Sequence, residues 1–212
     1  EVNQLIADYP TPDGVDLEVG GTVEDQGDAF GDLGTLLILI VILVYIVMAT
    51  QFESLKFPFI IMFTIPFAFT GVFLALWMTS TPLSLIALIG AIMLVGIVTK
   101  NGIVMVDYMN LLIERGSGVF DAVIAGGKSR LRPVLMTSFT TILGMLPLAI
   151  GTGAGSETWQ PMGIAVIGGL TFSTILTLFI VPVLYSILVN RSQRKEREKL
   201  ARLSAEHQAS KH

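Results

Sequence analysis

The fold is decided by the stretch LSLIALIGAIMLVGIVTKNGIVMVDYMNLL at residues 83–112. Its first seventeen residues carry no charge, and Lys100 and Asn101 then stand inside an otherwise apolar sequence. As an α-helix this stretch would be about 45 Å long, which exceeds the ~30 Å hydrocarbon core of a bilayer. We therefore predict a helix that spans a membrane and continues into the polar layer.

Lys100 lies within this predicted span, where a charge is costly. A lysine at the centre of a spanning helix costs about 3 kcal/mol, which the surrounding Leu, Ile and Val residues offset. Lys100, Asp107 and Glu114 are spaced by seven and so share one helix face. Two interpretations of Lys100 stay open at this point: a functional group that faces other helices or water, or an anchor whose amine reaches the lipid headgroups.

The composition indicates an integral membrane protein. Of the 212 residues, 52% are hydrophobic and only 14% are charged, a balance that cannot cover the surface of a soluble domain. The chain has no cysteine, and both of its histidines lie close to the C-terminal end, so we expect no resident metal site. No catalytic pair, phosphate loop or nucleic-acid motif is visible, and we expect a protein that is not an enzyme, has no cofactor and binds no nucleic acid.

Runs of residues without charge predict an all-α membrane domain at residues 33–189. The five expected spans are residues 33–52, 57–78, 83–112, 133–150 and 162–189. Pro66 would lie inside the second span, and Pro133 would begin the fourth after a short interfacial helix at residues 119–127. Small residues predict points of close helix packing, namely Ala87, Gly90, Ala91, Gly96, Gly144, Gly163, Ala165, Gly168 and Gly169.

The two ends of the chain differ in charge. Residues 1–32 hold nine acidic residues and no Lys or Arg, and signals for a helix, a turn and a strand predict a short α/β remnant of a soluble domain. The chain begins with Glu1, so we expect it to be part of a longer protein. Residues 190–212 hold seven Lys and Arg, and the loop at residues 114–132 holds four. By the positive-inside rule, the tail is expected in the cytoplasm and the N-terminal piece outside.

A second set of polar residues stands at the start of the fourth span. Arg130 and Thr137 are seven apart, and Ser138, Thr140 and Thr141 add hydroxyls. Either these groups share a polar site with Lys100, or Arg130 only determines topology and the hydroxyls bond within their own helix.

The counter-ion of Lys100 is a separate question. Asp107 lies about 10 Å from Lys100 along the helix axis, too far for a direct bond. A buried Lys100 would need its counter-ion from protein that is not present here.

Five motifs stand out along the chain: VYIVMATQFESLKFP (residues 44–58), TKNGIVMVDYMN (99–110), RLRPVLMTSFTTILGMLPLAIGTGAGSE (130–157), PMGIAVIGGL (161–170) and VPVLY (181–185). They resemble the C-terminal membrane half of resistance–nodulation–division (RND) efflux pumps, most closely those of the hydrophobe/amphiphile branch. The resemblance covers nearly the whole chain. It implies that the five spans are helices eight to twelve of twelve, and that residues 1–32 end a periplasmic porter domain.

The resemblance also implies a function. Lys100, Asn101, Thr137 and Arg130 match the family's proton-relay positions, which would act with two aspartates of the absent N-terminal half. The expected protein is a secondary transporter in the bacterial inner membrane that exchanges drugs for protons, using the proton motive force. Its expected partners are two further copies in a homotrimer, a periplasmic adaptor and an outer-membrane channel. Two alternatives stay open: a metal-ion pump of the same superfamily, and a protein-export or scaffold subunit that transports no small molecule.

Overall fold

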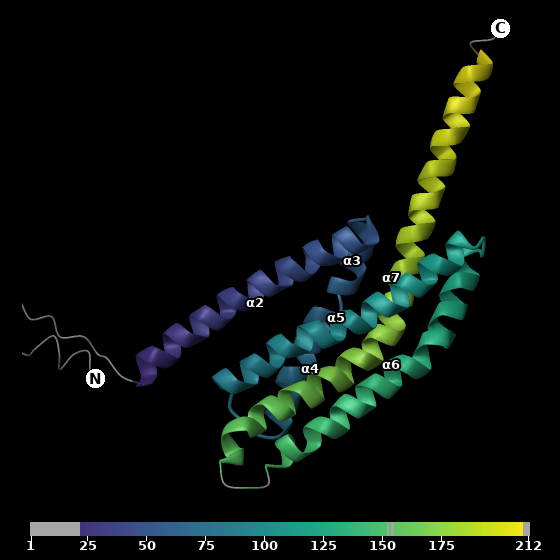
Figure 1. Ribbon diagram of the computed structural model, residues 1–212. Helices are drawn as coiled ribbons and strands as arrows, with labels where there is room; N and C mark the ends of the chain where they lie inside the picture. The colour runs from purple at the N-terminus through teal and green to yellow at the C-terminus, as the bar shows by residue number, and fades with distance from the viewer. Residues whose placement is uncertain (1–21, 152, 154, 210–212) are drawn as a thin grey trace, which may run out of the picture.

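The computed structural model describes residues 22–151, 153 and 155–209, which form a bundle of long helices (Figure 1). Most of the expected soluble α/β remnant falls on residues 1–21 and so lies outside the described residues. The described part contains helices and no strand, and five of its segments are long and apolar enough to cross a membrane. The prediction of an all-α integral membrane fold with five spans is confirmed.

The helices follow one another with short connections. They are α2 (Thr22–Phe52), α3 (Lys56–Met62), α4 (Ile65–Met78), α5 (Leu85–Glu114), α6 (Val119–Ile150) and α7 (Ser156–Ala209). The third predicted span agrees with α5 to within two residues at each end. Ser84 begins α5, since its side-chain oxygen accepts a hydrogen bond from the backbone N–H of Ala87.

The second span is divided ahead of Pro66, so the prediction of one helix with Pro66 inside it is wrong. α3 ends at Met62, α4 begins at Ile65, and Pro66 stands in the first turn of α4. Proline has no N–H, and its ring collides with the carbonyl four residues back, so the first turn of a helix is where it is accepted. The buried Thr64 hydroxyl donates to the Ile61 carbonyl over 2.6 Å, which satisfies a carbonyl at the break.

In the fourth span, by contrast, the sequence predicts a break between two helices that the structure does not contain. A separate interfacial helix at residues 119–127 and a helix start at Pro133 are expected, but α6 runs unbroken from Val119 to Ile150 with Pro133 inside it. Figure 1 shows α6 curving along its length, as a helix does where proline removes one backbone bond. The prediction is wrong here because a helix can continue past a proline when it gives up one backbone hydrogen bond and bends, and α6 does so at Pro133.

The fifth span is part of a longer helix than expected. α7 begins at Ser156, before Met162, and continues through the basic tail to Ala209. The tail is rich in Arg, Lys, Glu, Leu and Ala, which all favour a helix, so no signal stops the helix at the membrane boundary. Figure 1 shows the far part of α7 projecting beyond the other helices.

α7 lies along α4, α5 and α6, and glycines allow the closest approaches. A Cβ built on Gly168 would lie 2.1 Å from the Cβ of Ala75, and one on Gly169 would lie 2.1 Å from Cδ2 of Leu94. By contrast, a Cβ on Gly96 or Gly144 would meet nothing within 4 Å in the part of the chain that the structure describes. The predicted packing role is therefore confirmed at Gly168 and Gly169, whereas Gly96 and Gly144 face open space.

This contrast predicts the effect of one added methyl group. Gly168→Ala places a Cβ where Ala75 already stands, so α4 and α7 must separate, and we expect a loss of about 1–3 kcal/mol in unfolding free energy. Gly96→Ala is the matched control, with the same change in helix propensity and free space around it. Unfolding of both variants of the 212-residue chain in detergent measures the difference. Equal stability of the two variants would contradict the tight α4–α7 contact.

Candidate functional site

The helix α5 has one face packed in the bundle and one face that no described helix covers. The exposed residues on the uncovered face recur at intervals of three, four or seven, as expected for a single stripe along a helix. We call them the open stripe of α5: Ile89, Met93, Gly96, Lys100, Asp107 and Leu111.

Lys100 stands near the middle of this open stripe. Its neighbours Thr99 and Asn101 are buried, with 2% and 8% of their surface exposed, whereas Lys100 itself is exposed. Among the described residues, no ion pair or hydrogen bond satisfies the Lys100 ammonium, and Asp107 is likewise without a cationic partner. The described residues therefore present a cation near the middle of α5, a helix long enough to span a membrane, on a surface that no described helix covers.

Thr137 also lies on an exposed surface, on α6. Its hydroxyl lies 2.9 Å from the Val134 carbonyl and 3.2 Å from the Pro133 carbonyl, to which it can donate. The hydroxyls of Thr140 and Thr141 also donate to carbonyls four residues back. This is the ordinary use of a threonine hydroxyl within a membrane helix, and it leaves the oxygen lone pairs of Thr137 as the group it can offer to a neighbour.

Arg130 is held by an aromatic ring. Its guanidinium carbon lies 4.5 Å from the ring centroid of Tyr108 on α5, within the range of a cation–π contact. The Nε of Arg130 is buried and has no hydrogen-bond partner among the described residues. The Tyr108 contact thus fixes the N-terminal part of α6 against α5, and the Nε donor of Arg130 stays unused within the described residues.

This contact sets the relative depth of Lys100 and Thr137. Figure 1 shows α5 and α6 running in opposite directions after a short turn. Lys100 precedes Tyr108 by eight residues, and Thr137 follows Arg130 by seven. At the helical rise, both therefore lie about 10–12 Å from the contact, toward the same side of the membrane. The structure places the two residues at a similar depth on exposed surfaces, without a hydrogen bond between them in the described part.

Two polar contacts between helices complete the arrangement, and sequence reasoning did not find them. Ser138 on α6 and Thr174 on α7 share a buried hydrogen bond of 2.9 Å, and the Tyr185 hydroxyl on α7 donates to Oδ1 of Asn110 on α5. A further buried hydroxyl, that of Thr177, has no partner among the described residues. The polar residues in the fifth span were the available signal, but their partners lie far away in the sequence.

Comparison with known proteins places this arrangement in a family. The sequence profile of the AcrB/AcrD/AcrF family matches residues 1–189. The swarming motility protein SwrC of Bacillus subtilis is 38% identical over 185 residues, which are 87% of this chain and 18% of SwrC. The cobalt-zinc-cadmium resistance protein CzcA of Cupriavidus metallidurans is also 38% identical over 185 residues, 87% of this chain and 17% of CzcA. The multidrug resistance protein MdtC of Erwinia tasmaniensis is 42% identical over 163 residues, 76% of this chain and 16% of MdtC.

A solved structure agrees with these relatives. The crystal structure of a heavy metal efflux pump superimposes with a TM-score of 0.75 at 30% identity, over 88% of this chain and 19% of the pump. The chain thus spans less than a fifth of the length of the relatives and of the pump that it matches.

Proposed function

Since the chain belongs to the AcrB/AcrD/AcrF family of RND permeases, we propose that it carries the cationic part of a proton relay that drives export across the inner membrane. The observation that carries the proposal is Lys100, a cation inside a predicted span, on an uncovered helix face, with no counter-ion among the described residues. Such a charge is costly unless it is paired, so the uncovered face is where a carboxylate from outside the described residues would approach.

The proposed relay has two states. While carboxylates of a facing helix are ionised, they attract the Lys100 ammonium and hold α5 close. When a carboxylate takes up a proton, this attraction is lost and α5 shifts against the facing helix. Packed helices would pass such a shift to the soluble part of the transporter, because a tightly packed interface changes between discrete arrangements. A secondary active transporter of this kind is driven by the proton gradient and needs no cofactor.

The other predicted residues take supporting roles in this proposal. Thr137 lies at the depth of Lys100, and its oxygen can accept a hydrogen bond from a water molecule on the relay path. Asn101 is buried beside Lys100 and would orient that stretch of α5. Arg130, held by Tyr108, would tune the cytoplasmic exit of the proton.

Drug export is the transport function that we propose first, and it is supported by the 42% identity with a multidrug resistance protein. Metal-ion export is the second candidate, supported by the similarity to CzcA and to the heavy metal efflux pump. Accumulation assays in cells that express the complete protein distinguish them. Drug export predicts lower accumulation of a fluorescent cationic dye, and metal export predicts lower accumulation of zinc, cobalt or cadmium. If neither falls, the non-transporting scaffold alternative is favoured.

The proposed membrane orientation can be tested on its own. The excess of Lys and Arg in the tail and at residues 114–132 supports an orientation with Asn190 in the cytoplasm and Glu157 in the periplasm. Both residues are exposed, and the chain has no cysteine. In cells with a permeabilised outer membrane, a membrane-impermeant thiol reagent should therefore label Glu157→Cys and leave Asn190→Cys unlabelled until the inner membrane is broken. The reverse pattern would invert the orientation.

The proposed assembly follows the same family. We propose a homotrimer in the inner membrane that works with a periplasmic adaptor and an outer-membrane channel.

A further inference from the structure

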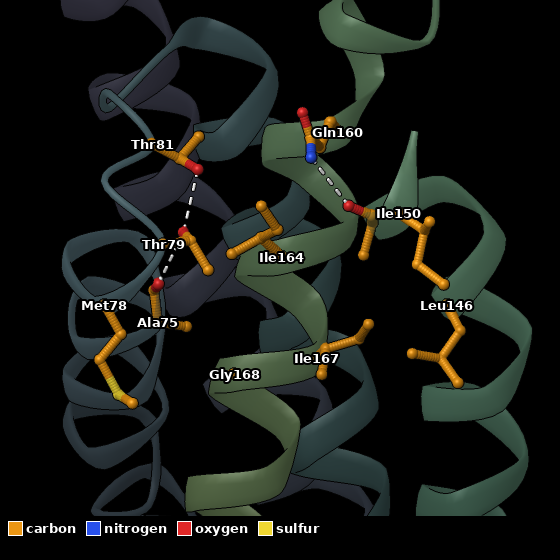
Figure 2. A pocket seen from close by; sticks show the side chains of 11 residues that line it. Ala75, Met78, Thr79, Thr81, Leu146, Ile150, Gln160, Ile164, Ile167 and Gly168 are labelled. Carbon is orange, nitrogen blue, oxygen red and sulfur yellow. Dashed lines mark hydrogen bonds between the residues drawn. The ribbon is translucent and has the colours of Figure 1, made fainter. Parts of the chain in front are cut away.

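A cavity of about 420 Å³ lies between α4, α6 and α7, away from Lys100 (Figure 2). At its upper edge in Figure 2, Thr81 belongs to the connection after α4 and Gln160 lies near the start of α7, which follows the connection after α6. In the proposed orientation, these connections face the periplasm. The cavity therefore lies in the outer leaflet, and its volume is in the range of small-molecule sites.

The cavity is polar at one end only. Ile164 and Ile167 of α7, Leu146 of α6 and Met78 of α4 form apolar walls. Figure 2 shows the polar side chains of Thr81 and Gln160 at the upper end of the cavity, apart from each other, with Thr79 below Thr81. A ligand with one polar end and a long apolar body would match this distribution.

Two contacts fix α7, which forms one wall of the cavity, against its neighbours. Nε2 of Gln160 donates to the Ala149 carbonyl over 3.0 Å and joins the start of α7 to the end of α6. The close approach of Gly168 to Ala75 fixes α7 on α4 at the other end. From Gln160 to Gly168, the α7 wall is about 12 Å long.

The rim of the cavity faces away from the bundle. Met78, Leu146 and Ile150 have 71%, 37% and 64% of their surface exposed. In the sequence, the connections beside the cavity contain no Lys or Arg, so no cation there would select an anionic headgroup. An apolar chain that enters from the surrounding bilayer is the occupant that this chemistry suits.

We propose that this cavity binds one acyl chain of an outer-leaflet phospholipid, with the ester region of the lipid at Gln160 and Thr81. The bound chain fills the space between α4, α6 and α7, and so acts as a packing element of the outer half of the domain. This proposal is independent of the Lys100 relay.

Photo-crosslinking in vesicles tests the proposal. The complete protein is reconstituted in phosphatidylethanolamine and phosphatidylglycerol that contain a phosphatidylethanolamine with a diazirine near the end of one acyl chain. After irradiation, mass spectrometry should find adducts concentrated on the α6 and α7 walls of the cavity. Ile167→Trp should lower these adducts several-fold by filling the cavity, whereas Ile175→Trp, at a 54% exposed position on α7, should not.

Leu146→Trp, from the opposite wall, provides a second way to fill the cavity if Ile167→Trp does not fold. Adducts spread evenly over cavity residues and exposed positions such as Ile175 and Phe179 would overturn the proposal, because they indicate only surrounding lipid. It would also be overturned if the Trp variants that fold left the cavity adducts unchanged, or if a transported drug but no lipid labelled the cavity.

Discussion

Replacing Lys100 by methionine is expected to abolish proton-coupled export while the protein remains at near-normal abundance in the membrane. Methionine has a similar length and removes only the charge, and Lys100 is exposed on α5, so no packing contact within the described bundle is lost. Without the cation, facing carboxylates would repel each other and stay partly protonated. Protonation of a carboxylate would then no longer change its attraction to α5, so the relay would lose its two states. Export should fall to the level of an empty vector.

The control for this variant is Lys128→Met, at an exposed position near the N-terminal end of α6. It makes the same chemical change outside the proposed relay, and it should export like the parent protein. Thr137→Ala should reduce export less than Lys100→Met, because a water molecule can replace one hydroxyl. Export by Lys100→Met equal to the parent at equal abundance would show that Lys100 is only an anchor at the membrane surface.

The 212-residue chain expressed by itself is expected to insert in the membrane and to export nothing. The described residues supply the cation of the proposed relay but no carboxylate within reach of it, since Asp107 lies about 10 Å further along the same helix. Accumulation of drugs and of metal ions should therefore equal that of cells with an empty vector. A Lys100→Met version of the same chain serves as the control, and it should behave identically.

Co-expression with the remaining part of the protein should restore export only for the chain that carries Lys100. Export by the chain alone would contradict the account, because it would show that no outside carboxylate is needed.

The fold was largely predictable because the membrane imposes a simple rule on the sequence. Long runs without charge located all five spans, and Ser84 and Gly151 stand at helix ends where the sequence changes from helix to turn. The two proline predictions failed because the sequence alone does not show whether a helix restarts at a proline or continues past it. Pro66 stands in the first turn of α4, whereas Pro133 lies inside α6, which continues without the hydrogen bond that proline removes.

The site was predictable to the extent that it depends on one helix. The spacing of Lys100 and Asp107 placed both on one face of α5, and the structure shows that face exposed. The contacts of Arg130 with Tyr108 and of Ser138 with Thr174 depend on how two helices meet, which spacing within one helix does not determine. Gly96 illustrates the same limit, because a small residue in a span does not reveal whether a helix lies against it.

In the proposed relay, the positive charge of Lys100, rather than its bulk, couples protons to export. The chain has no cysteine, so Lys100→Cys can be modified selectively in a complete protein that contains no other cysteine. Aminoethyl methanethiosulfonate rebuilds an ammonium at this position, and ethyl methanethiosulfonate adds a neutral group of similar size. With modification verified by mass spectrometry, we predict that substrate-coupled proton flux in proteoliposomes is absent for Lys100→Cys and returns only with the aminoethyl group. Equal flux with both reagents, or full flux before modification, would contradict the account.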